Sequence, residues 1–223
     1  WKISALQQLD RHVFVVLFFM VFSGCATSRI AGVNTANSHI EAIERVAENH
    51  STRMSDSEGV ALVSLAKAGA VGFGALGWSA SVYLKDPVSN KYGPPAFVNA
   101  AGVSAGLFYA GLNVVDFILL FENREDAIAF AKRPAHLNFS NEASFLIWGR
   151  KQLIIPGAQE FSDGAGLSLG AIELELLFGG PRNELHNNMY GAGATVNKIL
   201  AGDVEIPDEL KSGLDRLNIL MQR

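Results

Sequence analysis

The sequence predicts a strand-rich α+β domain, in which a twisted antiparallel sheet or partial barrel is flanked by helices. Three observations indicate this fold class. Apolar and polar residues alternate with a period of two from Trp78 to Lys85, as in a half-buried strand. Glycines divide the chain after Glu58 into short apolar segments of strand length. Apolar residues at helical spacing occur in only a few segments, mainly near the two ends of the chain.

A first helix is expected to begin at Ser38, because serine is a favoured N-cap residue and Ile40, Ile43, Val46 and Ala47 then fall on one face. Strands are expected after it, and the Gly149–Lys151 stretch is typical of a hairpin tip. The expected strands are Gly59–Val63, Lys67–Gly77, Trp78–Leu84, Ala96–Ala100, Gly102–Gly111, Val114–Phe121, Leu153–Ile155, Phe161–Gly170 and Ala171–Phe178.

Val114–Phe121 is the most apolar run of the domain, which predicts a strand inside the sheet. Asn123 is expected to cap the helix that follows, since Glu125 and Asp126 in its first turn suit the helix dipole. A short helix is expected to end at Gly202. The last helix should begin at Pro207, and its apolar face contains Leu210, Leu214, Leu217 and Met221.

The N-terminal part of the chain carries a short apolar run between a basic and a small-residue segment. Arg11-His12 precedes ten apolar residues, Val13–Phe22, and Ser23-Gly24-Cys25 follows. A helix that spans a bilayer needs about 20 apolar residues, so this run is short for that purpose. Its length is typical of the apolar region of a secretory signal peptide.

Phe22-Ser23-Gly24-Cys25 resembles the lipobox of bacterial lipoproteins, in which the cysteine is acylated and becomes the first residue. The resemblance implies a signal peptide at 1–24, a lipid anchor on Cys25, a flexible tether at 25–38 and one domain at 39–223. Ala26 in place of Asp favours the outer membrane, with the domain in the periplasm. Cleavage by ordinary signal peptidase, with release of the protein, and an uncleaved anchor are the alternatives.

Composition excludes several classes of function. The chain has a formal net charge of −4, whereas nucleic-acid binding requires a clustered basic face. A single cysteine permits no disulfide within the chain and no cysteine-based zinc site. The five histidines are scattered without metal-ligand spacing, so no metal or other cofactor is expected.

Two sequence motifs suggest enzymes, but neither has the context that catalysis requires. Gly72–Gly77 reads G-x-G-x-x-G, yet a strand follows it where a dinucleotide site needs a helix. Gly166–Gly170 reads G-x-S-x-G around Ser168, and only His186 and three glutamates follow as partners. These do not make a workable triad, so the protein is expected not to be an enzyme, and a serine hydrolase is the weakest hypothesis.

Five stretches in order resemble the SYLF-domain family of lipid-binding proteins. They span about residues 55–217 and include Tyr92-Gly93-Pro94-Pro95 and Asn188-Met189-Tyr190-Gly191. The other three are Lys67–Gly77 with the strand after it, Asp116–Leu120 with Asn123-Arg124, and Gly164–Leu169. Ile199–Pro207 belongs to the same closing stretch as Asn188-Met189-Tyr190-Gly191. The resemblance implies binding of membrane phospholipid, including phosphoinositide-type anionic headgroups, without catalysis or a cofactor.

The densest basic pairs of the domain are the expected headgroup contacts. These pairs are Lys132-Arg133 and Arg150-Lys151, and Trp148 is the expected aromatic residue at the membrane interface. The alternative function is an envelope scaffold that binds a protein partner and uses its acyl chains only as an anchor.

Overall fold

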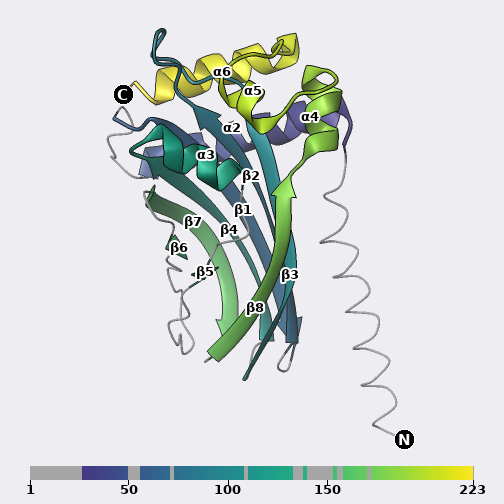
Figure 1. Ribbon diagram of the computed structural model, residues 1–223. Helices are drawn as coiled ribbons and strands as arrows, with labels where there is room; N and C mark the ends of the chain where they lie inside the picture. Colours follow the sequence, from purple (N-terminus) through teal and green to yellow (C-terminus); the bar gives the residue numbers. More distant parts are fainter. Residues whose placement is uncertain are drawn as a thin grey trace, which may run out of the picture.

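The computed structural model describes residues 27–49, 56–70, 73–107, 110–132, 138–139, 153–154, 158–169 and 172–222 (Figure 1). Its helices are α2 (Arg29–Asn49), α3 (Arg124–Lys132), α4 (Asn183–Tyr190), α5 (Val196–Leu200) and α6 (Asp208–Leu220). Its strands are β1 (Gly59–Ala70), β2 (Phe73–Leu84), β3 (Ala96–Leu107), β4 (Ala110–Phe121), β5 (Asn138–Phe139), β6 (Leu153–Ile154), β7 (Ala158–Leu169) and β8 (Ile172–Pro181).

Six long strands form one open antiparallel sheet in the order β7-β4-β1-β2-β3-β8, and β5 pairs with β6 separately. The expected fold class, an α+β domain built on an antiparallel sheet, is confirmed. The apolar run Val114–Phe121 lies in β4, which pairs on both sides and is therefore an interior strand, as expected. Lys67–Gly77 does not form one strand, because β1 continues to Ala70 and β2 begins at Phe73.

The two edge strands of this sheet meet at one end. Leu169 ends β7 and Ile172 begins β8, so their Cα atoms lie no more than about 11 Å apart. In a flat sheet of six strands the edges would be separated by about 24 Å. The sheet is therefore strongly curled at this end, and Figure 1 shows β7 and β8 converging there.

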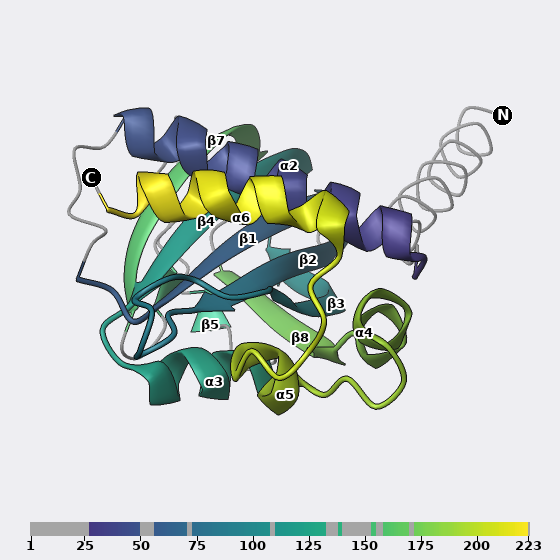
Figure 2. The same ribbon diagram turned by 90° about the horizontal axis from the view of Figure 1, so that it is seen from above.

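Helices cover both faces of the sheet, but only over one end of the strands. Figure 2 shows α2 and α6 side by side over one face and α3 with α5 over the other. Figure 1 shows the strands extending well beyond all of these helices. We call the covered end the helical end of the sheet and the remainder the distal half.

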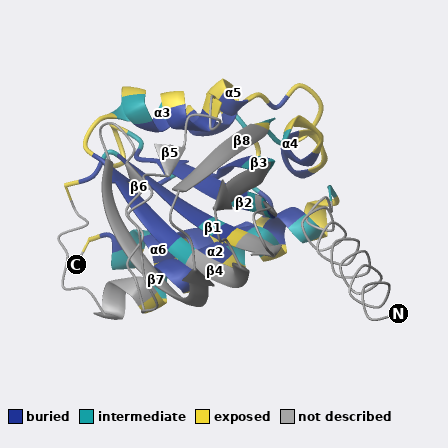
Figure 3. Cartoon of the chain, turned by 90° about the horizontal axis from the view of Figure 1, so that it is seen from below, coloured by how far each residue is buried: buried dark blue, intermediate teal, exposed yellow. Residues whose placement is uncertain are grey.

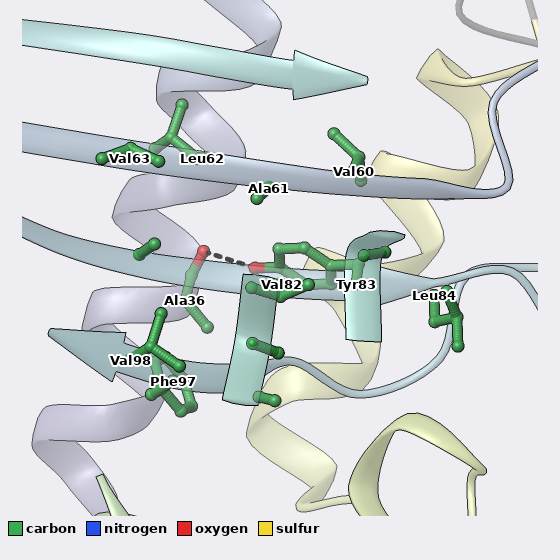
Figure 4. Packing of buried hydrophobic residues seen from close by; sticks show 14 of the residues in the cluster. Ala36, Val60, Ala61, Leu62, Val63, Val82, Tyr83, Leu84, Phe97 and Val98 are labelled. Atoms are coloured by element: carbon green, nitrogen blue, oxygen red, sulfur yellow. Dashed lines mark hydrogen bonds between the residues drawn. The ribbon is translucent and has the colours of Figure 1, made fainter. Parts of the chain in front are cut away.

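The hydrophobic core lies at the helical end, between the sheet and its two helix layers (Figure 3). Leu62 and Tyr83 face α2, and the Tyr83 hydroxyl donates a hydrogen bond of 3.4 Å to the backbone oxygen of Ala36 (Figure 4). On the opposite face, Trp78 stacks on Phe130 of α3 with ring centroids 6.0 Å apart. These contacts identify which face of each strand belongs to which helix layer.

The expected flexible tether at 25–38 is wrong for its larger part, because α2 already begins at Arg29. The Ser28 hydroxyl accepts a hydrogen bond from the backbone N–H of Ala31 and so caps the helix ten residues before Ser38. Val33 and Ala36 are buried in the core. A Cβ on Gly32 would lie 2.0 Å from the sulfur of Met189 in α4. The small residues of this segment therefore permit close packing of helices.

The expected C-terminal elements are largely confirmed. Asn123 accepts a hydrogen bond from the Asp126 N–H and caps α3. Thr195 caps α5, and Gly202 adopts a positive φ of 80° shortly after it ends. The four apolar residues expected on the face of α6 are all buried. Helix α4 is not predicted by the sequence, because four of its eight residues, Asn183, Glu184, Asn187 and Asn188, are polar and exposed.

The β5–β6 pair confirms a return strand at Leu153–Ile154, and its partner is Asn138–Phe139. The expected hairpin tip at 149–151 and the alternating residues at 143–147 lie outside the described residues. Within the described chain, the helices are all too short or too polar to cross a membrane.

Candidate functional site

Of the residues expected to contact lipid, only Lys132 lies in the part of the chain that the structure describes. It is exposed in the last turn of α3. The other expected residues lie outside the described residues; these are Cys25, Arg133, Trp148, Arg150 and Lys151.

The two enzyme-like motifs fall inside strands. Gly74 and Gly77 are part of β2, so this segment continues as a strand where a dinucleotide site would open a helix. Ser168 lies within β7 opposite Gly111, near the distal end of the sheet. A catalytic serine of the G-x-S-x-G type requires a sharp strand-to-helix turn, which is absent at this position.

Ser168 and His186 lie at opposite ends of the sheet. His186 is on α4, where its Nε2 accepts a hydrogen bond of 2.8 Å from the backbone N–H of Phe97 at the start of β3. The register of the sheet places Ser168 at the level of Ser104 on β3, and Ser104 is seven residues beyond Phe97. Seven residues of a strand span about 23 Å, so the sheet does not bring this pair together.

The two described histidines are buried and neutral. His39 of α2 is 5% exposed and hydrogen-bonds through Nδ1 to the Ser81 hydroxyl on β2. Burial, with a smaller contribution from the nearby Arg182, lowers the pKa of the His39 imidazole to about 4. Burial is also the main cause that lowers the pKa of His186 to about 4, and Arg182 adds a smaller effect in the same direction. Both imidazoles connect helices to the sheet and have little or no access to solvent.

A small polar hollow of about 200 Å³ lies at the C-terminal end of α6. Asn218 holds its wall together, because its side chain accepts from the Tyr92 N–H at 2.6 Å and donates to the Tyr92 oxygen at 3.2 Å. The ammonium of Lys85 lies 5.5 Å from the centre of the Tyr92 ring. Ligand pockets for small molecules usually measure about 300–1,000 Å³, so this hollow suits at most a very small ligand.

A polar row crosses the sheet where the helical end meets the distal half. The Ser64 hydroxyl of β1 donates a hydrogen bond of 2.7 Å to the carboxylate of Asp116 on β4. Ser64 is also paired with Ser79, and Ser79 is paired with Asn99. Asp163 of β7 is paired with Asp116. Since paired residues share a face, the row lies on the face of Leu62 and Tyr83, which carries α2 and α6.

Beyond the polar row, the same face carries apolar residue types on all six strands. The first row consists of Ala165, Val114, Ala66, Gly77, Ala101 and Phe178. The second consists of Leu167, Leu112, Ala68, Ala75, Val103 and Leu176. A third row continues with Leu169, Ala110, Phe73, Ala105 and Leu174. We call these three rows the apolar rows.

The opposite face of the distal half has a different composition. Its positions include Lys67, Asn113, Ser104 and Glu175, together with several glycines and the apolar Leu76 and Leu177. The glycines are Gly69, Gly74, Gly102, Gly106, Gly111, Gly164 and Gly166. Glycine in a strand is typical of tight bends, which agrees with the curled end of this sheet.

The N-terminal end of α2 is fixed to the rest of the domain. The carboxylate of Glu184 on α4 accepts a hydrogen bond of 3.1 Å from the Thr27 hydroxyl, and the Asn188 side chain donates to the Thr27 backbone oxygen at 2.8 Å. Arg29 forms an ion pair of 2.8 Å with Glu209 at the start of α6. The chain is therefore held in place from Thr27 onward.

No group of three or more His, Cys, Asp or Glu side chains in the described segments is arranged to hold a metal ion. Comparison with known proteins finds no family model that matches the chain, and no significantly similar curated protein or solved structure. The site with the most distinctive arrangement of residues is the distal half of the sheet, where the polar row borders the apolar rows.

Proposed function

We propose that the protein is a lipid-anchored envelope protein of the SYLF type that binds phospholipid, without catalysis, on the apolar rows. The observation that carries this proposal is the register of the sheet. Six adjacent strands place residues without charge or hydrogen-bonding side chains on one face for three successive rows. This is the face that α2 and α6 cover at the helical end of the sheet.

The dimensions of the apolar rows suit lipid acyl chains. Six strands are about 24 Å wide and three rows extend over about 14 Å, which gives an area of a few hundred Å². An apolar area of this size, where it is exposed to solvent, is typical of a site that contacts membranes, ligands or other proteins. An acylated Cys25, which the lipobox-like sequence at Phe22–Cys25 implies, would hold the domain beside phospholipid, and this favours lipid over a protein partner.

The first prediction tests the apolar rows directly. In a chain that begins at Ala26, Leu112→Lys is expected to reduce co-sedimentation with phospholipid vesicles several-fold, because it introduces a charge into the second apolar row. Asn113→Lys is the matched control, since it adds the same charge to the same strand on the opposite face. It is expected to bind as the unsubstituted chain does, and thermal unfolding would verify that both variants are folded.

Equal binding by the two variants would contradict the assignment of lipid to this face. If the unsubstituted chain binds to none of the vesicles, the envelope-scaffold function becomes the better account, and the anchor is then the sole contact with lipid.

A second prediction concerns the cationic residues. Replacement of Lys132, Arg133, Arg150 and Lys151 by Gln is expected to remove the part of vesicle binding that weakens with salt. Attraction between exposed cations and anionic headgroups is screened by salt, whereas burial of apolar surface is not. Vesicles with and without anionic lipid, at low and high salt, would measure this part. An unchanged salt dependence in the variant would remove these residues from the headgroup site.

A further inference from the structure

The segment between Cys25 and the folded domain is much shorter than the flexible tether expected at 25–38. Thirteen extended residues, from Cys25 to Ser38, would reach about 45 Å. In the structure α2 begins at Arg29, and hydrogen bonds already hold Thr27. Two residues from Cys25 to Thr27 span at most about 7 Å. An acylated Cys25 would therefore hold Thr27 within that distance of the lipid headgroups.

The surface around Thr27 is suited to lie against a membrane. Ile30, in the first turn of α2, is a large apolar side chain that is 74% exposed. The nine residues from Asn187 to Thr195 carry no charge, and most of them are exposed. Asn188 connects this segment to Thr27. Figures 1 and 2 both show α4 beside the start of α2.

We propose that this end of the molecule, consisting of the first turn of α2, the C-terminal half of α4 and the Gly191–Thr195 loop, faces the phospholipid surface in a fixed orientation. The inference rests on the proposed acylation of Cys25. It adds a statement of which face of the domain lies against the membrane when the anchor is inserted. Exposed apolar residues near the two ends of the helix layer then have different surroundings. Ile30 contacts the headgroup region, while Val88, at the far end of α6, remains in water.

The test uses the full acylated chain reconstituted into phospholipid vesicles. Acylation occupies the thiol of Cys25, the only cysteine of the chain, so an introduced cysteine can be labelled selectively with a fluorophore. Labels are placed in Ile30→Cys, in Ala192→Cys and, as a matched control, in Val88→Cys, which is 93% exposed at the other end. Quenching by lipids that carry a nitroxide at the headgroup is then measured.

The expected result is several-fold stronger quenching of the labels at positions 30 and 192 than of the label at 88. Insertion of about twelve Gly and Ser residues between Ala26 and Thr27 provides a long flexible tether. In that variant the difference between the positions is expected to be lost.

Equal quenching at all three positions, or stronger quenching at 88, would overturn the orientation while the anchor remains established. An unchanged difference after the insertion would show that the short tether does not orient the domain, and would also overturn the inference. Mass spectrometry that finds no acyl chain on Cys25 of the chain from the membrane would instead refute the anchor on which the inference rests. The Leu112→Lys comparison tests lipid binding by the sheet independently of the anchor.

Discussion

Acidification from pH 7 to pH 4 is expected to lower the free energy of unfolding by several kcal/mol, because the fold buries two neutral imidazoles. His39 connects α2 to β2, and His186 connects α4 to β3. The pKa of each imidazole is lowered to about 4 from an ordinary value of 6.5. The Nε2 atom of His186 accepts the Phe97 N–H, so protonation there would place two donors against each other.

The direction of the effect follows from which state binds more protons. Between pH 6.5 and pH 4 the unfolded chain protonates these histidines, while the folded chain does not. The stabilisation is therefore complete above pH 6.5 and is lost as the pH falls toward 4. A pKa difference of this size corresponds to about 3 kcal/mol for each histidine. Together they represent a large part of the 5–15 kcal/mol that is typical of a domain's stability.

Urea unfolding at pH 7, 6, 5 and 4 would measure this dependence. The double variant His39→Gln/His186→Gln has side chains that can hydrogen-bond but do not ionise at these pH values, and its stability is expected to change much less over this range. Carboxylates with lowered pKa values, such as Asp86, contribute mainly below pH 4, so their effect is separable. A pH slope that is the same in the double variant and the parent protein would contradict the assignment to these histidines.

The fold class followed from the sequence because the signals for strands are local. Alternation in β2, the apolar run in β4, the Asn123 cap of α3 and the glycine after α5 depend on neighbouring residues, and all are located correctly. The turn between β1 and β2, in contrast, has no local signal in the sequence. Lys67–Gly77 has no charged or proline residue at its turn, so the sequence did not show that the chain reverses between Ala70 and Phe73.

The segment before Ser38 was misread because small and polar residues fit two roles. Small residues such as Gly32 and Ala36 are of types that are common in flexible linkers. They also allow a helix to approach its neighbours closely. Which role applies depends on Met189 and on the sheet, both far away in the sequence. The same reason explains why α4 was missed, since its buried residues become apparent only when α2 and β3 are in place.

The apolar rows could not be predicted, because they depend on the register between strands. Val114, Ala66 and Ala101 are unremarkable one by one, and a shift of one residue would move each of them to the other face. Their combination on one face requires the pairing of all six strands. The roles of His39 and His186 were hidden for the same reason, since their partners are brought close only by the fold.

The role of α2 as a layer of the core leads to the second large effect. Ile40→Ala is expected to lower the free energy of unfolding by about 2–4 kcal/mol, because it leaves a cavity between α2, α6 and the sheet. Ile40 is fully buried, and its Cδ1 lies 3.1 Å from the position that a Cβ on Gly213 of α6 would occupy. Urea unfolding at pH 7, where both described histidines are neutral, would measure the loss.

Ile30→Ala is the matched control, because it makes the same substitution in the same helix at a residue that is 74% exposed. Its effect in solution is expected to stay within about 0.5 kcal/mol. If Ile40→Ala were as mild as Ile30→Ala, α2 would not be an integral layer of the domain, and the segment before β1 would again act as a tether. In that case Thr27 would no longer be a fixed point, and the orientation at the membrane would lose its physical basis. A large effect of Ile40→Ala alone would support α2 as the rigid connection between the anchor and the sheet.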